Sequence, residues 1–258
     1  CFTEDFEMSD YFSKLLAEQK LTDAEIKALQ ELRATIENQL SVLSGNPRFY
    51  YAGSYGKHTM IRQRYDLDIV VYWPHDCDYT IKGIYDAVGR TLMKHWRCVI
   101  PKTVCWELPF QGGFHIDVVP GRALDATFVE ANLYRTDTGT TLKTSLKKHI
   151  KIVRGSGRLD AIRLMKLWKE RRGVPFKKSF LLEVMTIIGC RGTSTTDYSK
   201  QLVAALRHIR DTIETCNIKD PANTANSLSD DLDKAARAKI KAAADAALRA
   251  KYWSEVFE

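Results

Sequence analysis

Residues 53–59 read Gly-Ser-Tyr-Gly-Lys-His-Thr and residues 65–71 read Tyr-Asp-Leu-Asp-Ile-Val-Val, and these two stretches decide the fold. The second predicts a strand over 67–73, where β-branched and aromatic residues follow one another up to a proline. Asp66 and Asp68 are two residues apart, so a strand points both carboxylates to the same face. Like charges this close are unfavourable unless a cation lies between them or one is protonated. The pattern predicts a divalent-cation site, and oxygen ligands favour Mg²⁺.

On its own, a pair of this kind is more simply interpreted as a solvent-facing acidic pair at the start of a strand. The glycine–serine turn upstream changes the interpretation. Gly53 and Ser54 stand thirteen residues before Asp66 and directly follow a short aromatic stretch, 48–52, that is typical of a strand. A glycine lets the backbone approach a phosphate closely, and the following amides and the Ser54 hydroxyl can donate hydrogen bonds to it. We therefore expect a nucleoside triphosphate and its metal to share one edge of the sheet.

A third aspartate follows on a later predicted strand. Asp117 lies within His-Ile-Asp-Val-Val-Pro, residues 115–120, with apolar neighbours on either side. A carboxylate inside such a strand is costly unless it faces a cation or another partner. Beside Asp66 and Asp68 it would complete a site for two Mg²⁺ ions. One ion would hold the triphosphate and the other would lower the pKa of an attacking hydroxyl, for in-line displacement of pyrophosphate.

The composition is that of an ordinary globular protein. The 258 residues are 45% hydrophobic and 28% charged. No apolar run approaches the roughly 18 residues that span a bilayer, so no membrane partner is expected. The first residues do not resemble a signal peptide. The six cysteines form no CxxC pair, which favours a reduced compartment, and we expect a cytoplasmic protein.

The remaining pattern divides the chain into three segments. Apolar residues at helical spacing over 8–43, with a capping box at Thr22-Asp23-Ala24-Glu25, predict N-terminal helices within 1–47. Short strands, a helix over 86–96 and a hairpin turn at 111–113 predict a small mixed sheet within 48–140. Helical spacing returns in 141–258, where only 220–229 is predicted as a polar loop. The fold class is therefore α+β.

Positive charge is concentrated in one part of the chain. Residues 143–178 contain thirteen Lys and Arg against two acids, whereas the whole chain carries a net charge of +7. Such a stretch indicates an anionic partner, either the phosphates of small molecules or a nucleic-acid backbone, although solvated helix faces would have the same composition. The flanking basic side chains remain open as a nucleic-acid groove: Lys143, Lys147, Lys151, Arg154 and Arg158.

The glycine–serine turn, the paired aspartates and the later aspartate together resemble the polymerase-β-like nucleotidyltransferase superfamily. The resemblance covers residues 50–120. Two downstream stretches, 163–169 (RLMKLWK) and 178–183 (KSFLLE), are similar to the helical half of oligoadenylate synthetases, cyclic GMP–AMP synthase and bacterial cyclic-oligonucleotide synthases. Residues 220–226 (DPANTAN) resemble the DPxxPxN loop of that group, with Thr224 in place of the usual proline. This resemblance implies a nucleotidyltransferase core with N-terminal spine helices and a C-terminal helical bundle.

The resemblance also implies roles for three further residues. Lys166 and Ser179 match positions that contact the triphosphate, and Phe180 matches the aromatic residue that stacks on a base. Without the resemblance, a surface lysine and a core phenylalanine would be the simpler interpretations. Two features depart from the family pattern. His58 stands where glycine is common in the GSYxxGT form of the turn, and no His/Cys cluster resembles the zinc thumb of animal cyclic GMP–AMP synthase.

The leading hypothesis for function is a synthase that joins nucleoside triphosphates, ATP among them, into a cyclic di- or trinucleotide signal for antiphage defence. Nucleic acid is not expected to be required, and a regulatory partner protein is left open. One alternative is a transferase that extends RNA ends or makes linear oligoadenylate. The other is a catalytically dead nucleic-acid-binding scaffold, against which the three intact aspartates argue because a dead site has no reason to keep like charges together.

Overall fold

The computed structural model describes the backbone of residues 2–258 and the side chains of residues 10–258. The chain forms two compact units, each built from separate stretches of sequence. The sheet unit consists of residues 21–58 and 65–150. The helical unit consists of the chain up to Lys20, the short segment 59–64, and residues 151–258. No helix in the described part of the chain is long and apolar enough to cross a membrane.

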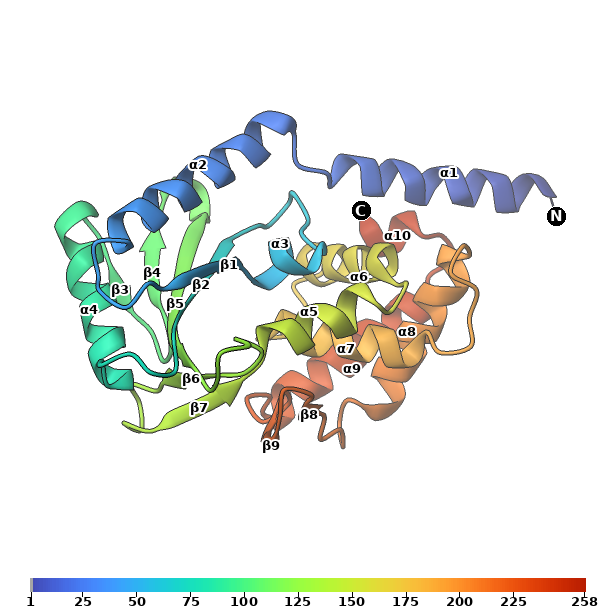
Figure 1. The fold of residues 1–258 in the computed structure, drawn as a ribbon. Helices are drawn as coiled ribbons and strands as arrows, with labels where there is room; N and C mark the ends of the chain where they lie inside the picture. The colour runs from blue at the N-terminus through green and yellow to red at the C-terminus, as the bar shows by residue number, and fades with distance from the viewer. Residues whose placement is uncertain (1) are drawn as a thin grey trace. The chain divides into compact units, whose positions relative to one another are not determined.

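The sheet unit holds seven strands in one mixed sheet (Figure 1). The strand order is β1-β2-β5-β4-β3, and β6 pairs with both β5 and β7. Strands β2 and β5 are parallel and the other pairs are antiparallel. The strands are β1 (Arg48–Tyr51), β2 (Leu67–Trp73), β3 (Ile100–Pro101), β4 (Trp106–Pro109), β5 (His115–Ala123), β6 (Ala131–Tyr134) and β7 (Thr141–Thr144).

Helices α2 (Asp23–Leu40), α3 (Gly53–Lys57) and α4 (Ile81–His95), with a 3₁₀ turn over Gln111–Gly113, complete this unit. Helix α4 packs against β5, β6 and α2. The predicted capping box is confirmed at the start of α2, where the Thr22 hydroxyl accepts from the Glu25 amide and the Glu25 carboxylate accepts from the Thr22 amide. Such a cap is worth about 1 kcal/mol.

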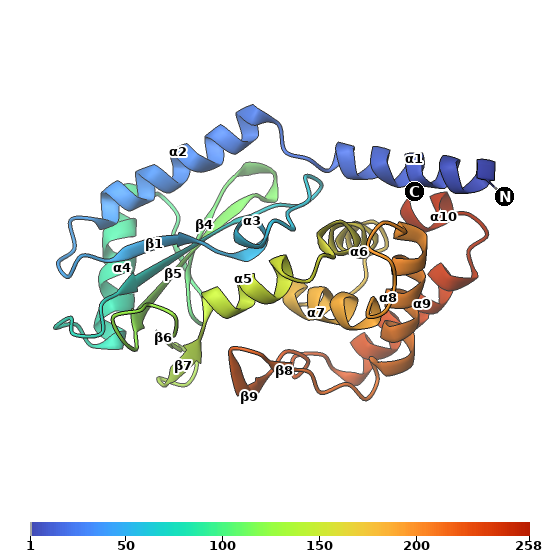
Figure 2. The same cartoon turned by 45° about the vertical axis from the view of Figure 1, so that its right-hand side comes forward.

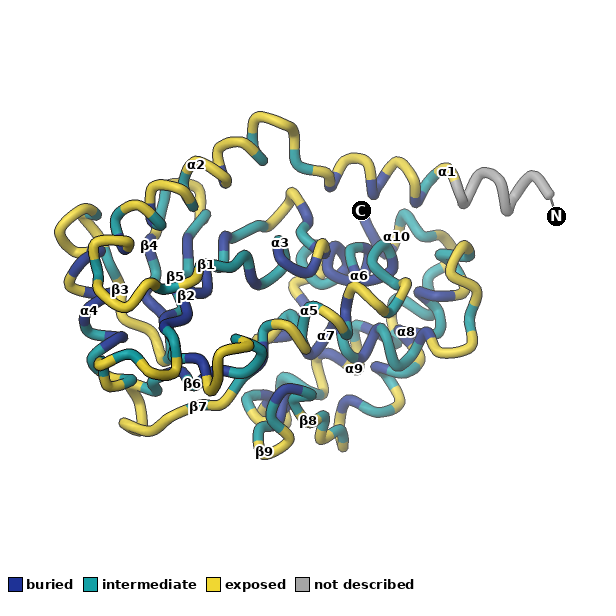
Figure 3. Tube along the Cα trace, viewed as in Figure 1, coloured by how far each residue is buried: buried dark blue, intermediate teal, exposed yellow. Residues whose placement is uncertain are grey.

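The central strand β2 is buried on both faces. Leu67, Ile69 and Val71 are inaccessible to solvent. Val70 and Tyr72, on the other face, pack in an apolar cluster with Ala52, just before α3, and with residues of β6. Figure 3 colours the chain by burial, with buried segments in dark blue. The strand predicted over 67–73 is therefore confirmed in type and extent. Asp68 is the second residue of this strand, which forms the sheet's only parallel pair with β5.

The helical unit is built on six helices and a small hairpin, and all are visible in the two ribbon views (Figures 1 and 2). Its core is formed mainly by α6, α7, α8 and α9. The elements are α1 (Phe2–Glu18), α6 (Leu159–Arg171), α7 (Ser179–Gly189), α8 (Tyr198–Thr212), α9 (Lys234–Arg249), α10 (Ser254–Phe257), β8 (Lys219–Asp220) and β9 (Asn223–Ser227). Helix α5 (Leu146–Arg154) begins in the sheet unit and its last residues belong to the helical unit.

Three local expectations differ from the structure. Helix α4 begins at Ile81 rather than at residue 86, because the Thr80 hydroxyl caps it by accepting from the Gly83 amide. The loop expected over 220–229 contains the short hairpin β8–β9. The strands β6 and β7 were not anticipated. They pair antiparallel around a turn at residues 135–140, where the polar, threonine-rich composition hides the strand pattern.

Candidate nucleotidyltransferase site

The three predicted carboxylates meet at one place in the sheet unit. Strands β2 and β5 run parallel with Asp68 opposite Asp117 in register, so residues 49 positions apart in sequence become direct neighbours. Asp66 precedes β2 on the same face as Asp68. The apolar residues between and after them, Leu67 and Ile69, face away into the core. The parallel register therefore assembles Asp66, Asp68 and Asp117 into one acidic centre.

The electrostatics of this centre favour a bound cation. Burial, followed by the charges of Asp66 and Asp117, raises the pKa of Asp68 to about 7. Burial likewise raises the pKa of Asp117. Its Oδ1 atom is buried and has no hydrogen-bond partner among the described residues. An orphaned, buried carboxylate oxygen beside further carboxylates fits divalent metal ions, which supply the missing positive charge.

The glycine–serine turn lies directly against the acidic centre. The Ala52 amide donates to the Asp68 carbonyl over 2.9 Å, and the chain then enters α3 at Gly53. Gly53 has φ +52°, and a Cβ built on it would lie 1.6 Å from Asp68 Oδ2. Only glycine fits this position, because both the left-handed backbone and the contact exclude a side chain. Ser54 follows it, so the predicted phosphate-binding turn and the predicted metal-binding pair lie at one edge of the sheet.

Two further residues of the turn bear on the site. His58, which stands where the family pattern has glycine, adopts the left-handed conformation (φ 61°, ψ 34°) and ends α3. The turn therefore has the left-handed conformation that glycine adopts readily, although histidine occupies the position. This conformation costs a non-glycine residue about 1–2 kcal/mol. Lys57 is buried, and its charge partly offsets the rise in the Asp68 pKa. Sequence reasoning did not single out Lys57, although it belongs to the same motif.

Two more side chains surround Asp117. Glu107 of β4 lies opposite Asp117 in the antiparallel register, and His115 lies two residues before it on the same face of β5. Ligand atoms of Glu107, His115 and Asp117 all lie within 4.8 Å of one another. His115 Nε2 is also 3.6 Å from Asp66 Oδ2. The sequence could have predicted that His115 and Asp117 share a strand face, because they are two residues apart. It could not have predicted that Glu107 lies beside them, because that depends on strand register.

The other three predicted site residues lie in the helical unit. Lys166 on α6 is buried, and its ammonium forms an ion pair of 2.7 Å with Glu183 of α7, which has no exposed surface. The same ammonium donates to the carbonyl and hydroxyl oxygens of Thr59 at 3.2 and 3.1 Å. The Thr59 hydroxyl in turn donates to Glu183. An ammonium has three donors, so these partners account for all of them.

Ser179 is the first residue of α7 and is partly buried. Phe180 follows it and packs, partly exposed, against the core of the helical unit. The simpler interpretation of Lys166 as a surface lysine is wrong, because the residue is buried. The structure thus brings Gly53, Ser54 and the three aspartates together in the sheet unit and places Lys166, Ser179 and Phe180 in the helical unit.

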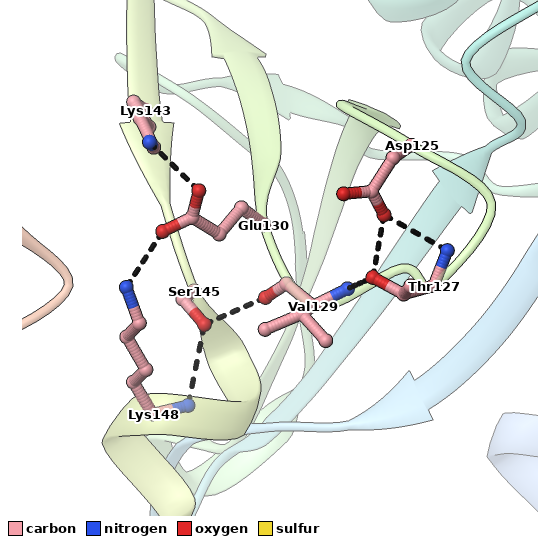
Figure 4. A network of polar contacts seen from close by, with 7 residues as sticks. All are labelled: Asp125, Thr127, Val129, Glu130, Lys143, Ser145 and Lys148. Carbon is pink, nitrogen blue, oxygen red and sulfur yellow. Dashed lines mark hydrogen bonds and ion pairs between the residues drawn. The ribbon is translucent and has the colours of Figure 1, made fainter.

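Part of the basic stretch is neutralised within the sheet unit. Lys143 and Lys148 both pair with Glu130, at 2.7 and 2.6 Å (Figure 4). Hydrogen bonds from these two ammonium groups lower the pKa of Glu130 to about 2. In the same network the Ser145 hydroxyl donates to the Val129 carbonyl over 2.6 Å. Lys143 therefore holds β7 to β6 in addition to contributing charge to the predicted basic stripe.

Arg158 has a similar local role in the helical unit. Its guanidinium donates to the carbonyls of Thr193 and Ser194, at 2.7 and 3.0 Å. Of the five basic side chains left open as a nucleic-acid groove, Lys143 is thus paired with an acid and Arg158 uses hydrogen-bond donors on backbone carbonyls, which leaves fewer donors for the phosphates of a polymer.

Replacing Gly53 with alanine is expected to disable the site. The added methyl group would collide with Asp68, and a displacement of about 1 Å in a catalytic centre costs roughly 100-fold in rate. Gly112→Ala is the matched control, since Gly112 also has a positive φ (+73°) but has nothing within 4 Å of an added Cβ. Turnover and Mg²⁺ binding, measured on both variants, check the prediction. Equal activity of the two proteins would mean that the contact between Gly53 and Asp68 is dispensable.

Comparisons with known proteins place this geometry in context. No protein-family model matches the chain, and no curated protein matches it significantly. Solved structures do match. CdnC from E. coli MS115-1, solved with ATP, is 22% identical, with 98% of this chain and 97% of that chain covered at a TM-score of 0.73. A second structure of that protein, 21% identical, is a CdnC:HORMA-deltaN complex.

Two proteins with less similar sequences also match over most of this chain. The Bradyrhizobium diazoefficiens CD-NTase CdnG in complex with GTP is 13% identical, with 97% of this chain and 95% of that chain covered at a TM-score of 0.77. The Vibrio cholerae DncV cyclic AMP-GMP synthase, in complex with a linear pppApG intermediate, is 17% identical, with 98% and 83% covered at a TM-score of 0.66. The predicted α+β class is confirmed, and the chain has the polymerase-β-like fold of the bacterial CD-NTases.

Proposed function

We propose that this chain is a metal-dependent nucleotidyltransferase of the CD-NTase family, which joins nucleoside triphosphates into a cyclic di- or trinucleotide. The observation that carries the proposal is the register of β2 against β5, which sets Asp68 beside Asp117 while Gly53 touches Asp68. A phosphate-binding turn in contact with a cluster of carboxylates is the arrangement that nucleotidyl transfer needs. A role in antiphage defence and a cytoplasmic location belong to the same proposal.

The reaction transfers a nucleotidyl group from a triphosphate to a hydroxyl. The acceptor hydroxyl releases its proton to water as its oxygen forms a bond to the α-phosphorus, the bond between that phosphorus and the oxygen bridging to the β-phosphorus breaks, and pyrophosphate leaves. When bound, two Mg²⁺ ions supply Lewis acidity and neutralise the charge that develops on the oxygens. Asp66, Asp68 and Asp117 would hold these ions. The Ser54 hydroxyl and the adjoining backbone would bind and orient the phosphates.

The roles proposed for Lys166 and Ser179 are triphosphate contacts. For Lys166, this contact requires the ammonium to exchange its hydrogen bonds with Thr59 for bonds to a phosphate oxygen, because all three donors are already used. Glu183 would stay paired and keep the ammonium charged. Lys166 therefore has two roles in the proposal, one in the fold of the helical unit and one at the substrate.

The proposed partners are nucleoside triphosphates, ATP among them, as CdnC was solved with ATP and CdnG with GTP. The HORMA complex of CdnC supports a regulatory partner protein for this chain as well. Nucleic acid is proposed to be unnecessary, since two triphosphates carry about eight negative charges and part of the basic stretch is used internally.

The test is an assay of products. Nuclease-treated protein is incubated with ATP, GTP, CTP and UTP in Mg²⁺, the mixture is treated with phosphatase, and small products are identified by chromatography and mass spectrometry. A phosphatase-resistant cyclic product, lost in the Asp68→Asn variant, supports the proposal. A ladder of linear oligonucleotides would instead indicate an RNA-extending or oligoadenylate-forming enzyme. No product, with or without added duplex, would leave a catalytically dead scaffold as the better description.

Phe180→Ala is expected to impair the use of all four nucleotides while the protein stays folded. Stacking of a base on an aromatic ring is worth about 1–3 kcal/mol and tolerates any base, and the partial exposure of Phe180 limits the loss of core packing. Phe176→Ala is the control, because Phe176 is 3% exposed and its removal should cost about 3–5 kcal/mol in stability. Michaelis constants and melting curves of both variants check this. A large fall in the melting temperature of the nucleotide-free Phe180→Ala protein would refute the stacking role.

A further inference from the structure

A histidine that the proposed two-magnesium chemistry does not use lies beside the acidic centre. His115 lies at the start of β5, two residues before Asp117 on the same face, and Glu107 of β4 lies opposite Asp117. One ligand atom from each of these three residues lies within 4.8 Å of the other two. Two carboxylates and an imidazole at this spacing can hold one divalent cation.

The imidazole is already oriented for such a role. His115 Nδ1 lies 3.5 Å from the Gly113 carbonyl oxygen, the acceptor toward which a proton on Nδ1 points. Nε2 lies on the side of the carboxylates, 3.6 Å from Asp66 Oδ2. A metal-bound histidine commonly donates its other ring N–H to a backbone carbonyl in this way. The side chain is 26% exposed, so an ion can reach it.

A second observation also indicates a ligand at this position. Asp117 Oδ1 is buried without a hydrogen-bond partner among the described residues, and the Asp117 carboxylate offers an oxygen to the cluster with Glu107 and His115. The cation paired with Glu107 is Lys102, at 2.9 Å, and its side chain is 46% exposed. An exposed ion pair of this kind is weak. A metal ion can therefore displace Lys102 from Glu107, whereas no described group satisfies Asp117 Oδ1.

We propose that Glu107, His115 and Asp117 bind one divalent cation through two carboxylates and His115 Nε2, so that the centre takes Mn²⁺ in preference to Mg²⁺. The physical reason is the nitrogen ligand. Mg²⁺ is a hard ion that prefers oxygen and keeps its waters, whereas first-row transition ions accept imidazole readily. The proposal deepens the proposed function and rests on it only for the use of the ion in catalysis, because Asp117 is shared with the proposed catalytic metals.

The test uses Mn²⁺ itself as the probe and needs no turnover. Full-length protein stripped with a chelator is loaded with Mn²⁺, and pulsed electron paramagnetic resonance detects coupling of the electron spin to an imidazole ¹⁴N nucleus. We expect this coupling in the wild type and its loss in His115→Gln, together with a loss of Mn²⁺ affinity of about tenfold or more. His75→Gln is the matched control. His75 is also exposed beside an aspartate, 4.0 Å from Asp76, but outside the cluster, and its removal should change neither readout.

For a second variant we expect Mn²⁺ affinity to change in the opposite direction. Lys102→Met removes the cation that competes for Glu107, so Mn²⁺ should bind more tightly than in the wild type. Competition with Mg²⁺ completes the test, because His115→Gln should narrow the preference for Mn²⁺ over Mg²⁺. Absence of ¹⁴N coupling in the loaded wild type overturns the inference, even if cyclic product is formed. Coupling without any nucleotide product leaves the inference standing and counts against the proposed function.

Discussion

Asp68→Asn is expected to abolish nucleotidyl transfer while leaving the fold intact. Asp68 lies at the centre of the site, opposite Asp117 in register and in contact with the position of Gly53. Loss of a metal ligand removes several kcal/mol of transition-state stabilisation, which corresponds to roughly a thousandfold or more in rate. The rate of product formation at saturating triphosphate and Mg²⁺ measures this effect. Asp76→Asn, which changes an exposed aspartate of the same unit, is the control.

The same variant should not lose stability in the absence of metal. Asparagine removes one of three clustered like charges, so the melting temperature of chelator-treated protein should stay level or rise. The stability of the metal-free wild type should also depend on pH. Because the folded pKa of Asp68 is raised to about 7 from an ordinary value of 3.8, the folded protein binds the proton more tightly than the unfolded chain. Its contribution to stability is therefore fully present below the unfolded pKa and is lost as the pH rises through about 7.

Melting curves of metal-free wild type and Asp68→Asn between about pH 4 and pH 7, the interval between the unfolded and folded pKa values of Asp68, check the sign. The difference in favour of the variant should grow with pH, and Mg²⁺ should reduce it by stabilising the wild type alone. Substantial turnover in the Asp68→Asn protein, or a lower melting temperature than the wild type at high pH, would show that the metal assignment is wrong.

Lys166→Met is expected to destabilise the protein strongly, through the helical unit. It leaves the Glu183 carboxylate, which has no exposed surface, without its ion-pair partner. Breaking a buried pair in this way costs about 3–5 kcal/mol. In a chain of this size that corresponds to a fall in melting temperature of about 6–20 °C. Glu183→Gln should be destabilising for the converse reason.

The double variant Lys166→Met/Glu183→Leu separates structure from catalysis. It removes both charges and should recover most of the lost stability, since an apolar pair can replace a buried ion pair at little cost. It should not recover triphosphate binding if Lys166 contacts a phosphate. Lys200→Met, which alters an exposed pair with Asp197, is the control and should change stability by less than about 1 kcal/mol. Normal kinetics in the double variant would restrict Lys166 to its structural role.

Features of short range could be predicted from the sequence. The strand over 67–73 was predictable because the five consecutive residues from Ile69 to Trp73 are β-branched or aromatic and favour extended backbone, and burial on both faces stabilises that conformation. The cap of α2 was predictable because Thr22 and Glu25 are three residues apart and need no distant partner. The start of α4 was missed because it depends on the cap at Thr80. The strands β6 and β7 were missed because their short, partly polar sequences become extended through pairing with β5 and with each other.

The sequence by itself determined which residues we propose to carry the chemistry: a glycine–serine turn, a pair of aspartates on one strand face, and a third aspartate within a later strand. Only the tertiary structure decided how they meet. The register of β2 and β5 sets Asp68 beside Asp117, and β4 adds Glu107, because strand pairing depends on the whole sheet rather than on local pattern. Packing of α6 against α7 likewise decided that Lys166 is buried against Glu183, since a helical period shows which face a lysine occupies but not which charge lies opposite it.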